Sequence, residues 1–331
     1  MNDRVVVPDA EGLRRAVDLL RRESVVAFPT ETVYGLGADA FSAAAIAEVY
    51  RLKNRPTWNP LIVHVPTVAA ARRLAEIWPD TADELAERFW PGPLTLVVQR
   101  SWRLGDVGRT AAGTIAIRIP AHDVALKLLE AAELPLAAPS ANRSEGISPT
   151  TAEHVLRSLP DVPLVLDGGP STLGIESTVL DLTSTPPRLL RPGALGLRAL
   201  RDVTGAIAVP DDGVSDGAAR SSPGMSPRHY APRATVILAK DVDDVDATGL
   251  AGPIGVLTYE AGQPGKGSHL EVLSADPREY GADLYAALHR LDDAGVRTIL
   301  VQDPPETEDW LAIRDRLGRA AAPRGAGRSP A

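Results

Sequence analysis

Apolar and polar positions recur with two different periods along the first two-thirds of the chain. Leu13, Val17 and Leu20 follow Asp9 at helical spacing, which predicts a helix capped by that aspartate. The apolar run at 24–28 predicts a buried strand. Further strands are predicted over 61–65, 93–99, 114–119, 135–138, 163–166 and 177–182, and helices near 42–52, 67–77, 81–89, 121–132 and 149–158. Several strands follow one another without a helix, so we expect an α/β fold with a mixed sheet.

The periodic pattern breaks between residues 206 and 232, where Gly, Ser, Asp and Pro dominate. Structureless segments of this length are uncommon inside compact domains, so 206–232 is predicted to link two domains. After it, strands are predicted over 234–239, 254–259, 270–273 and 296–301, and helices over 277–293 and 307–321. We therefore predict a larger domain over 1–205, a small α/β domain over 233–322 and a frayed tail over 323–331.

Composition narrows the chemistry that the chain can perform. Of its 331 residues, 44% are hydrophobic and 24% are charged, as in an ordinary globular protein. The absence of cysteine excludes disulfides, thiolate nucleophiles and cysteine-ligated metals. A net charge of −8 argues against a protein that coats nucleic acid, although it leaves room for a local basic groove. No apolar run approaches the roughly 20 residues that span a bilayer, so we expect a cytoplasmic protein without a membrane anchor.

The segment 29–40 places polar residues at the exit of a predicted strand, just before two glycines. Its G-x-G-x-x-A pattern at 35–40 suggests dinucleotide binding. That reading fails because an acidic residue should follow about 20 positions on, where residues 58–60 are Trp-Asn-Pro. The segment is instead either a strained turn or a lip that presents Thr30 and Thr32 to a ligand.

Four cations stand at predicted strand or helix ends, interleaved with hydroxyl groups. The cations are Lys53, Arg55, Arg118 and Arg191, and the hydroxyls belong to Thr32, Ser140, Ser148 and Ser177. Open α/β sheets bind ligands at the carboxyl ends of their strands, so these groups can converge on one crevice. Such a lining suits a triphosphate together with a carboxylate. It does not suit a hydrolase, because neither a nucleophile elbow nor a Walker loop is present.

Each of these features also has a purely structural interpretation. The basic pair at 53–55 would complement the dipole at a helix C-terminus. Ser148 precedes a proline and reads as a helix cap. Thr114 and Arg118 share one face of a strand, which is either a cleft wall or a solvated surface. His64 lies in mid-strand, where a lone histidine is more often a satisfied core residue than a catalyst.

Several motifs, in order along the chain, resemble the YrdC-like threonylcarbamoyl-AMP synthase family in its two-domain form. They are Pro-Thr-Glu-Thr-Val-Tyr-Gly-Leu-Gly at 29–37, Lys-x-Arg-Pro at 53–56, Trp-Pro-Gly-Pro-Leu-Thr at 90–95, Ser-x-Asn at 140–142, Arg-Pro-Gly at 191–193 and the segment 223–232. The resemblance implies a YrdC-like twisted, open, mixed sheet followed by a smaller Rossmann-like α/β domain. It also implies that L-threonine, bicarbonate and ATP react to give threonylcarbamoyl-AMP and pyrophosphate.

The same resemblance assigns residues to two subsites. At threonine it implies Thr32, His64, Arg118, Ala138 and Ser177. At ATP it implies Arg55, Asn59, Thr114, Ser140, Asn142, Ser148, Arg191 and Tyr230. The expected catalytic residues are Lys53, Arg55 and Arg118. No metal ligands are expected from the protein, and Mg²⁺ is expected on the ATP phosphates. The linker over 206–232, which carries Tyr230, is predicted to close over the site as a lid.

Two other interpretations stay open. The same cleft would accept a phosphate backbone in an RNA-binding module, although aromatics are only 4% and no basic run is interleaved with them. An adenylating enzyme for a different amino acid carbamate fits the same residues. The family also implies a downstream tRNA threonylcarbamoyl transferase as a partner, and it leaves direct tRNA binding open.

Overall fold

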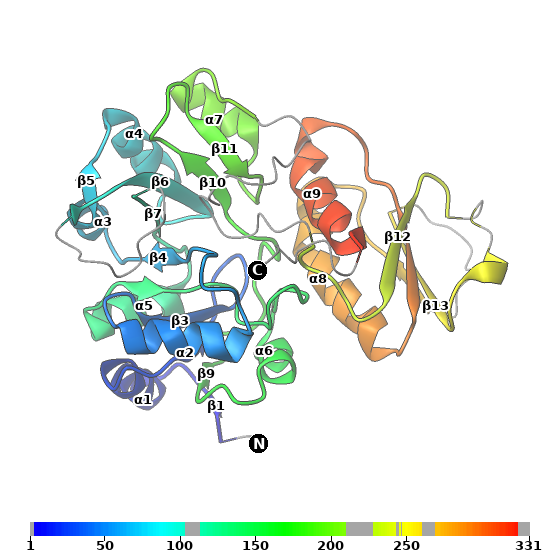
Figure 1. The fold of residues 1–331 in the computed structure, drawn as a ribbon, viewed down its shortest axis with the longest axis horizontal. Helices are drawn as coiled ribbons and strands as arrows, with labels where there is room; N and C mark the ends of the chain where they lie inside the picture. Colours follow the sequence, from blue (N-terminus) through cyan, green and yellow to red (C-terminus); the bar gives the residue numbers. More distant parts are fainter. Residues whose placement is uncertain are drawn as a thin grey trace.

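The computed structural model describes residues 3–102, 113–209, 228–242, 245, 247–259 and 269–323, which form two modules, each with its own sheet (Figure 1). Within those residues the first module holds an eleven-stranded sheet in the order β1-β9-β2-β3-β8-β4-β7-β6-β10-β11, with β5 paired to β6. The strands are β1 (Val5–Val6), β2 (Val26–Phe28), β3 (Gly35–Asp39), β4 (Ile62–His64), β5 (Ala75–Ile77), β6 (Leu94–Arg100), β7 (Thr114–Arg118), β8 (Leu136–Ala137), β9 (Val165–Leu166), β10 (Thr178–Asp181) and β11 (Arg188–Arg191). Parallel and antiparallel pairs occur side by side, which confirms the predicted mixed α/β sheet.

Helices cover both faces of one half of this sheet. The helices of the first module are α1 (Ala10–Arg21), α2 (Ala43–Lys53), α3 (Val68–Leu74), α4 (Asp80–Phe89), α5 (Asp123–Ala132), α6 (Ala152–Ser158) and α7 (Leu197–Thr204). Successive residues of a strand point to opposite faces, so Ala27 packs under α2 and α6 whereas Phe28 packs under α1 and α5. Asp9 caps α1 by accepting a hydrogen bond from the amide of Gly12, as predicted.

The other half of the sheet leaves one face available for a site. Ile115 and Ile117 of β7 pack with the helices α3, α4 and α7. Ala116 points to the opposite face, where it joins a small apolar cluster of strand residues only. Thr114 and Arg118 share that second face by the alternation of the strand. Because both side chains are buried, the alternative of a solvated sheet surface is wrong.

The second module confirms the predicted small α/β unit. Its parallel sheet has the order β12 (Thr235–Ala239), β15 (Thr298–Gln302), β13 (Ile254–Thr258) and β14 (His269–Val272). The helices α8 (Pro277–Asp293) and α9 (Leu311–Ala321) lie between this sheet and the first module (Figure 1). Their core cluster also contains Val33, Ile147 and Ile175 from the first module. The two modules therefore share one apolar core.

The predicted helix over 149–158 begins later than expected. It starts at Ala152, and Thr151 is its cap, accepting from the amide of His154. Ser148 is drawn away from a capping role because its hydroxyl donates to the buried carboxylate of Glu176, 2.6 Å away. The interpretation of Ser148 as a helix cap is therefore wrong.

Several short elements differ from the predicted pattern. The helix predicted over 67–77 ends at Leu74, because residues 75–77 pair instead with β6. The strands β3 and β11 and the helix α7 were not predicted at all. β3 begins with Gly-Leu-Gly and forms because β2 and β8 flank it on both sides. Its antiparallel pairing with β2 also rules out a dinucleotide-binding strand-to-helix turn.

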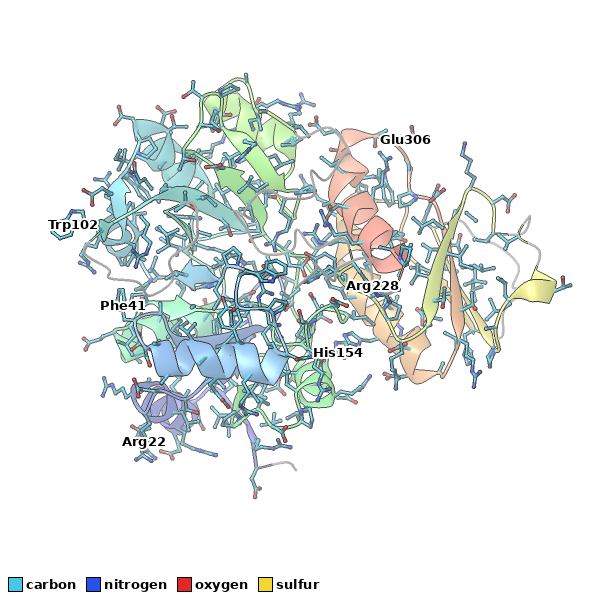
Figure 2. The ribbon with its side chains drawn as sticks, viewed as in Figure 1. Arg22, Phe41, Trp102, His154, Arg228 and Glu306 are labelled. Atoms are coloured by element: carbon cyan, nitrogen blue, oxygen red, sulfur yellow. The ribbon has the colours of Figure 1, made fainter. Side chains whose placement is uncertain are left out.

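Residues 210–227 of the predicted linker and 324–331 of the predicted tail lie outside the described residues. The lid role of the linker therefore stays a prediction. The described end of the linker contacts both modules. Arg228 donates to the carbonyl of Ala322 after α9, and the amide of Ala231 donates to the carbonyl of Glu145 in the first module. Figure 2 places Arg228, together with His154 of α6, at the junction between the modules.

No helix among the described ranges is both long enough and apolar enough to cross a membrane.

Candidate active site

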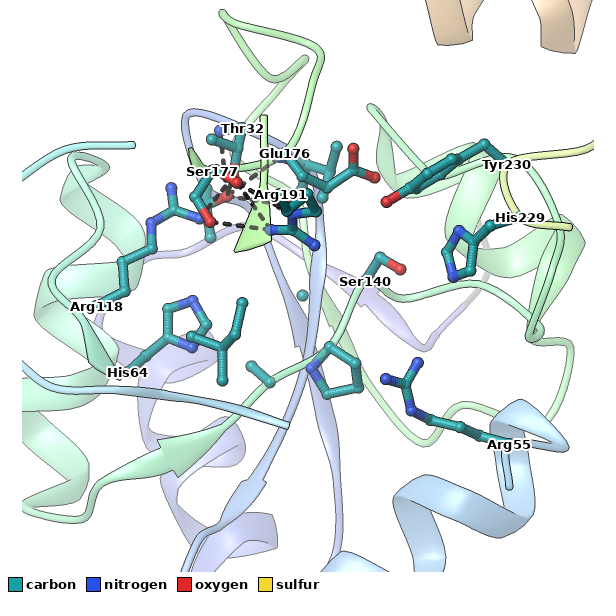
Figure 3. Close-up of a pocket in the computed structure, with 16 residues that line it drawn as sticks. Thr32, Arg55, His64, Arg118, Ser140, Glu176, Ser177, Arg191, His229 and Tyr230 are labelled. Atoms are coloured by element: carbon teal, nitrogen blue, oxygen red, sulfur yellow. Dashed lines mark hydrogen bonds between the residues drawn. The ribbon is translucent and has the colours of Figure 1, made fainter. Parts of the chain in front are cut away.

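A pocket with about 530 Å³ of open space lies where the segment 228–232 meets loops of the first module (Figure 3). The predicted residues that line it are Thr32, Arg55, His64, Arg118, Ala138, Ser140, Ser177, Arg191 and Tyr230. Five other predicted residues are buried without lining it: Lys53, Asn59, Thr114, Asn142 and Ser148. The structure thus brings most of the predicted site together.

Arg118 marks one end of the pocket (Figure 3). Its side chain leaves the end of β7 and is only 4% exposed. Nη1 donates to the hydroxyl of Thr32 at 2.9 Å, and Nε donates to the carbonyl of Gly92 at 3.2 Å. Nη2 lies 2.7 Å from a carboxylate oxygen of Glu31, as an ion pair without hydrogen-bond geometry. The guanidinium is therefore held in one orientation from three sides.

His64 lies beside Arg118 at the end of β4. Burial, followed by the charge of Arg118, lowers the pKa of His64 to about 3. The imidazole is therefore neutral at pH 7, and its Nδ1 has no hydrogen-bond partner among the described residues. Because it lines the pocket with an unpaired nitrogen, His64 is not a satisfied core histidine.

Arg191 and Ser177 form the wall between the two ends of the pocket. Nε and Nη2 of Arg191 donate to the carbonyl of Ser177 at 3.1 and 3.0 Å, and Nη2 also reaches its hydroxyl at 3.1 Å. That hydroxyl is 2.7 Å from the hydroxyl of Thr95. The contact requires a close approach at Gly193, where a Cβ would lie 2.4 Å from the backbone of residues 176–178. Glycine is therefore needed to bring Arg191 to the site.

Arg55 and Lys53 leave the end of α2 in different directions. Asn54 caps the helix in the left-handed conformation, with φ of 50°. Arg55 lines the pocket, and its Nη2 donates to the carbonyl of Pro60 at 3.0 Å. Burial lowers the pKa of Arg55 to about 10, so it remains charged at pH 7. Lys53 instead donates to the carbonyls of Ser140 and Asn142, both at 2.5 Å.

Lys53 therefore anchors the loop that carries Ser140. The hydroxyl of Ser140 donates to Oδ1 of Asn142 at 2.6 Å, and Nδ2 of Asn142 donates to the carbonyl of Gly146 at 2.7 Å. Asn142 thus orients Ser140 while lying outside the pocket wall. The Ser-x-Asn motif works as one unit in which the serine faces the pocket and the asparagine fixes the loop.

Tyr230 and His229 close the end of the pocket that lies opposite Arg118 (Figure 3). Tyr230 has a left-handed backbone, with φ of 61°, which is uncommon for a non-glycine residue. Its ring centre lies 4.0 Å from that of His229. Its hydroxyl has no hydrogen-bond partner among the described residues. A buried, unpaired hydroxyl in a pocket wall is available to a ligand.

Seven pocket residues lie outside the two predicted subsites: Thr30, Val33, Gly35, Ile62, Pro139, Glu176 and His229. Of these, Thr30 was expected only as part of the lip at 29–40. Glu176 is the one carboxylate in the pocket lining of the described residues, and it is 6% exposed. Its neighbour Ser177 was predicted, but a glutamate next to cationic candidates gives no sequence signal of its own. Ser148 of the first module holds one of its oxygens, and the partners of the other oxygen, Tyr285 and Arg316, come from the second module, far along the chain.

The lining can bind and orient anions. Three arginines, several hydroxyls and a neutral imidazole face one space, and no hydroxyl there is paired with a histidine as nucleophile and base. Charge-assisted contacts from arginine suit carboxylate and phosphate groups. Among the described residues no group of three or more His, Cys, Asp or Glu side chains is arranged to hold a metal ion.

Comparisons with known proteins agree with this arrangement. Residues 18–193 match the Sua5–YciO–YrdC family, described as "Telomere recombination", and residues 196–322 match "Threonylcarbamoyl-AMP synthase, C-terminal domain". Similar proteins include the threonylcarbamoyl-AMP synthases of Pyrococcus abyssi, 41% identical with 94% of each chain covered, and of Bacillus subtilis, 40% identical with 94% and 93% covered. The crystal structure of P. abyssi Sua5 complexed with L-threonine is 39% identical, covers 93% of this chain and 94% of that one, and has a TM-score of 0.84. This chain therefore belongs to the threonylcarbamoyl-AMP synthase family.

Proposed function

We propose that this chain makes threonylcarbamoyl-AMP from L-threonine, bicarbonate and ATP, with release of pyrophosphate. The main evidence is that one and the same pocket has Arg118 at one end and Arg55 and Tyr230 at the other, with Arg191 between them. A pocket with cations at separate ends can bind a small carboxylate and a polyphosphate next to each other, as a reaction between the two requires. Support comes from the relatives named threonylcarbamoyl-AMP synthase and from the relative that was crystallised with L-threonine.

The end of the pocket around Arg118 is proposed to hold threonine. Arg118 and Thr32 are already joined by a hydrogen bond, so a fixed guanidinium would meet the carboxylate of the amino acid. The hydroxyl of Ser177 and the neutral ring of His64 face the same space. Both can hydrogen-bond a small polar side chain without adding charge. A neutral donor and acceptor beside a cation suits threonine.

The opposite end is proposed to hold ATP. Arg55 and Arg191 line the wall, and Ser140 is held by the Lys53 and Asn142 contacts described above. These cations suit phosphate oxygens, and Tyr230 would cover the nucleotide. Mg²⁺ would be held by the ATP phosphates and water, as the absence of a protein ligand cluster in the described residues allows, and would neutralise charge on the pyrophosphate.

The proposed chemistry needs placement more than a strong base. Threonine and bicarbonate first give the N-carboxylate with loss of water. One of its oxygens attacks the α-phosphorus of ATP, the bond from that phosphorus to the bridging oxygen breaks, and pyrophosphate leaves. The nucleophile is already an anion, so the arginines act by aligning it and by stabilising the developing charge. The lining supplies groups of that kind.

Pyrophosphate release tests this function directly. We expect the purified chain to release pyrophosphate only when threonine, bicarbonate, ATP and Mg²⁺ are all present, because the nucleophile forms only when the amine is carboxylated. Each other amino acid should be tested in place of threonine. Equal release without bicarbonate would contradict the proposal. Faster release with another amino acid would instead favour an adenylating enzyme for that carbamate.

The product is proposed to pass to a separate transferase that modifies adenosine in tRNA. Threonylcarbamoyl-AMP is an activated anhydride, and a second enzyme is needed to transfer its acyl group. The purified chain should therefore leave tRNA unmodified after incubation with all substrates, as read by mass spectrometry of digested nucleosides. Modification by this chain alone would contradict the proposal.

A further inference from the structure

A buried arginine from the second module reaches the site in the first. Arg316 lies on α9 and is fully buried, with 0% exposure. On that helix Ile313, Leu317 and Ala320 form the apolar face that packs in the core, and position 316 falls on the same face. A cation there has no water to solvate it, so it must be compensated by groups across the junction.

Glu176 supplies that compensation across the junction, and Asp315 on α9 adds a second carboxylate, 2.6 Å from Nη1 of Arg316. Nε of Arg316 donates to Oε2 of Glu176 at 2.8 Å. The same carboxylate oxygen accepts from the hydroxyl of Tyr285 on α8 at 2.8 Å, and Oε1 accepts from Ser148 at 2.6 Å. Burial acts to raise the pKa of Glu176, but the charges of Arg316 and Arg191 outweigh it and lower that pKa below its ordinary value. Glu176 is therefore an anion in the pocket wall.

Tyr230 is the second point of contact. The guanidinium carbon of Arg316 lies 4.8 Å from the centre of the Tyr230 ring, within the range of a cation–π contact. The Tyr230 ring also stacks on Tyr285, with the ring centres 5.8 Å apart. The ring thus contacts both a cation and an aromatic side chain from the second module. This support fixes a residue whose backbone is in an uncommon conformation.

The charges explain why such support matters. Figure 3 shows the carboxylate of Glu176 between Arg191 and Tyr230, within the end of the pocket proposed for ATP. An unpaired carboxylate at that place would repel phosphates. It would also attract Arg191, which now contacts Ser177. Arg316 pairs with Glu176 from outside the pocket lining, so it counters the repulsion of phosphates and the attraction of Arg191 without filling the pocket.

We propose that Arg316 is a positioning residue for nucleotide binding: it neutralises Glu176 and holds Tyr230, so that the second module completes the ATP end of the site. The proposal rests on the function proposed above for its choice of nucleotide. Arg316 does not line the pocket, so its effect is exerted through these two residues.

Four variants test the proposal by isothermal titration with ATP and with threonine. In Arg316→Met, the dissociation constant for ATP should rise at least about tenfold, which corresponds to about 1.4 kcal/mol. The dissociation constant for threonine should change much less. Arg316→Lys keeps the charge but loses the planar group and should lie in between. In the double variant Arg316→Met with Glu176→Gln the unpaired charge is gone, so ATP binding should recover in part. Arg314→Met, two positions earlier on the same helix, is the matched control.

The outcomes separate a positioning role from a general structural one. If Arg316 only stabilises the fold, Arg316→Met weakens the binding of ATP and of threonine equally, and ATP binding does not recover in the double variant. That result overturns the proposal. ATP binding equal to wild type in Arg316→Met also overturns it. If Arg316→Met does not fold, the double variant and Arg316→Lys are measured instead. A larger loss of ATP affinity than of threonine affinity in them supports the proposal, and equal losses overturn it. A wild-type chain that binds ATP but releases no pyrophosphate overturns the proposed function alone, and one that binds no ATP overturns both.

Discussion

Arg55 and Arg118 carry the same charge but stand in different surroundings. Arg118 is paired with Glu31 and Thr32. Within the described part of the chain, the side chain of Arg55 instead donates to the backbone carbonyls of Asn59 and Pro60 in its own loop. Arg55→Ala should therefore weaken the binding of ATP, and Arg118→Ala should weaken the binding of threonine. Each lost charged hydrogen bond should cost about 1.5 to 3 kcal/mol. Isothermal titration calorimetry with ATP and with threonine measures the two dissociation constants for each variant.

The exposed Arg51 provides a control for this pair. It belongs to the same helix end as Arg55 and is bonded to Glu48 at the surface. Arg51→Ala should leave both affinities unchanged. If Arg55→Ala impaired threonine and Arg118→Ala impaired ATP, the two ends of the pocket would have to be exchanged.

Individual site residues were predictable where a motif fixes the local backbone. Arg55, Ser140 and Arg191 belong to such motifs, and the structure places all three in the pocket wall. The position of Lys53 depends on a loop that is 87 residues away in sequence, so the motif did not show that its ammonium would anchor that loop. The sequence could have indicated that Arg316 is a buried cation, because it interrupts the apolar face of a predicted helix. Its partner could not be read from the sequence, since 140 residues separate the two.

At the scale of elements, the turn after β11 controls the site. Gly193 touches the backbone of residues 176–178, whereas Gly196, three positions on, has no atom within 4 Å of an added Cβ. Gly193→Ala should displace Arg191 from Ser177, reduce turnover more than tenfold and destabilise the fold by about 1 to 3 kcal/mol. Gly196→Ala should be close to neutral. The turnover rate and urea unfolding of both variants test this prediction. Equal rates and equal free energies of unfolding in the two variants would refute the role of the turn.

Long periodic elements were predicted well, whereas some of the short ones were not. The helices α1, α8 and α9 carry clear apolar faces, so their spacing alone identifies them. The strands β3 and β5 are stabilised by neighbours from distant parts of the chain, and no local pattern reports that pairing. The mixed order of the sheet was expected from strands without intervening helices, but its strand order required the structure.

At the scale of the whole molecule, buried neutral histidines make the fold sensitive to acid. Burial lowers the pKa to about 3 at His64 and to about 4 at both His154 and His289. Rings with a lowered pKa contribute stability that is fully present above the unfolded value of about 6.5 and is lost as the pH falls below it. For His64, the free energy of unfolding should fall by up to about 1.4 kcal/mol per pH unit below that value.

Urea unfolding at pH 7 and pH 5 measures this effect. The midpoint should fall at pH 5 in the wild type, and His64→Gln should show a smaller fall because one titrating group is gone. An unchanged difference between the two pH values would show that His64 does not contribute. His154 and His289 stack at 3.8 Å across the module junction, so their titration should act there and persist in His64→Gln.

The pairing of Glu176 with Arg316 has a consequence for the order in which the protein is made. The two residues are 140 positions apart, so at about 5 to 20 residues per second the ribosome needs roughly 7 to 28 s to pass from one to the other. Until α8 and then α9 are made, Val33, Ile147 and Ile175 lack the partners that these helices supply. A nascent chain with its first sheet complete would hold Glu176 without its cationic partner beside an apolar patch, and would bind ATP more weakly. Full nucleotide affinity would thus be reached only after α9 has left the ribosome, and chains that stop earlier would be candidates for chaperones.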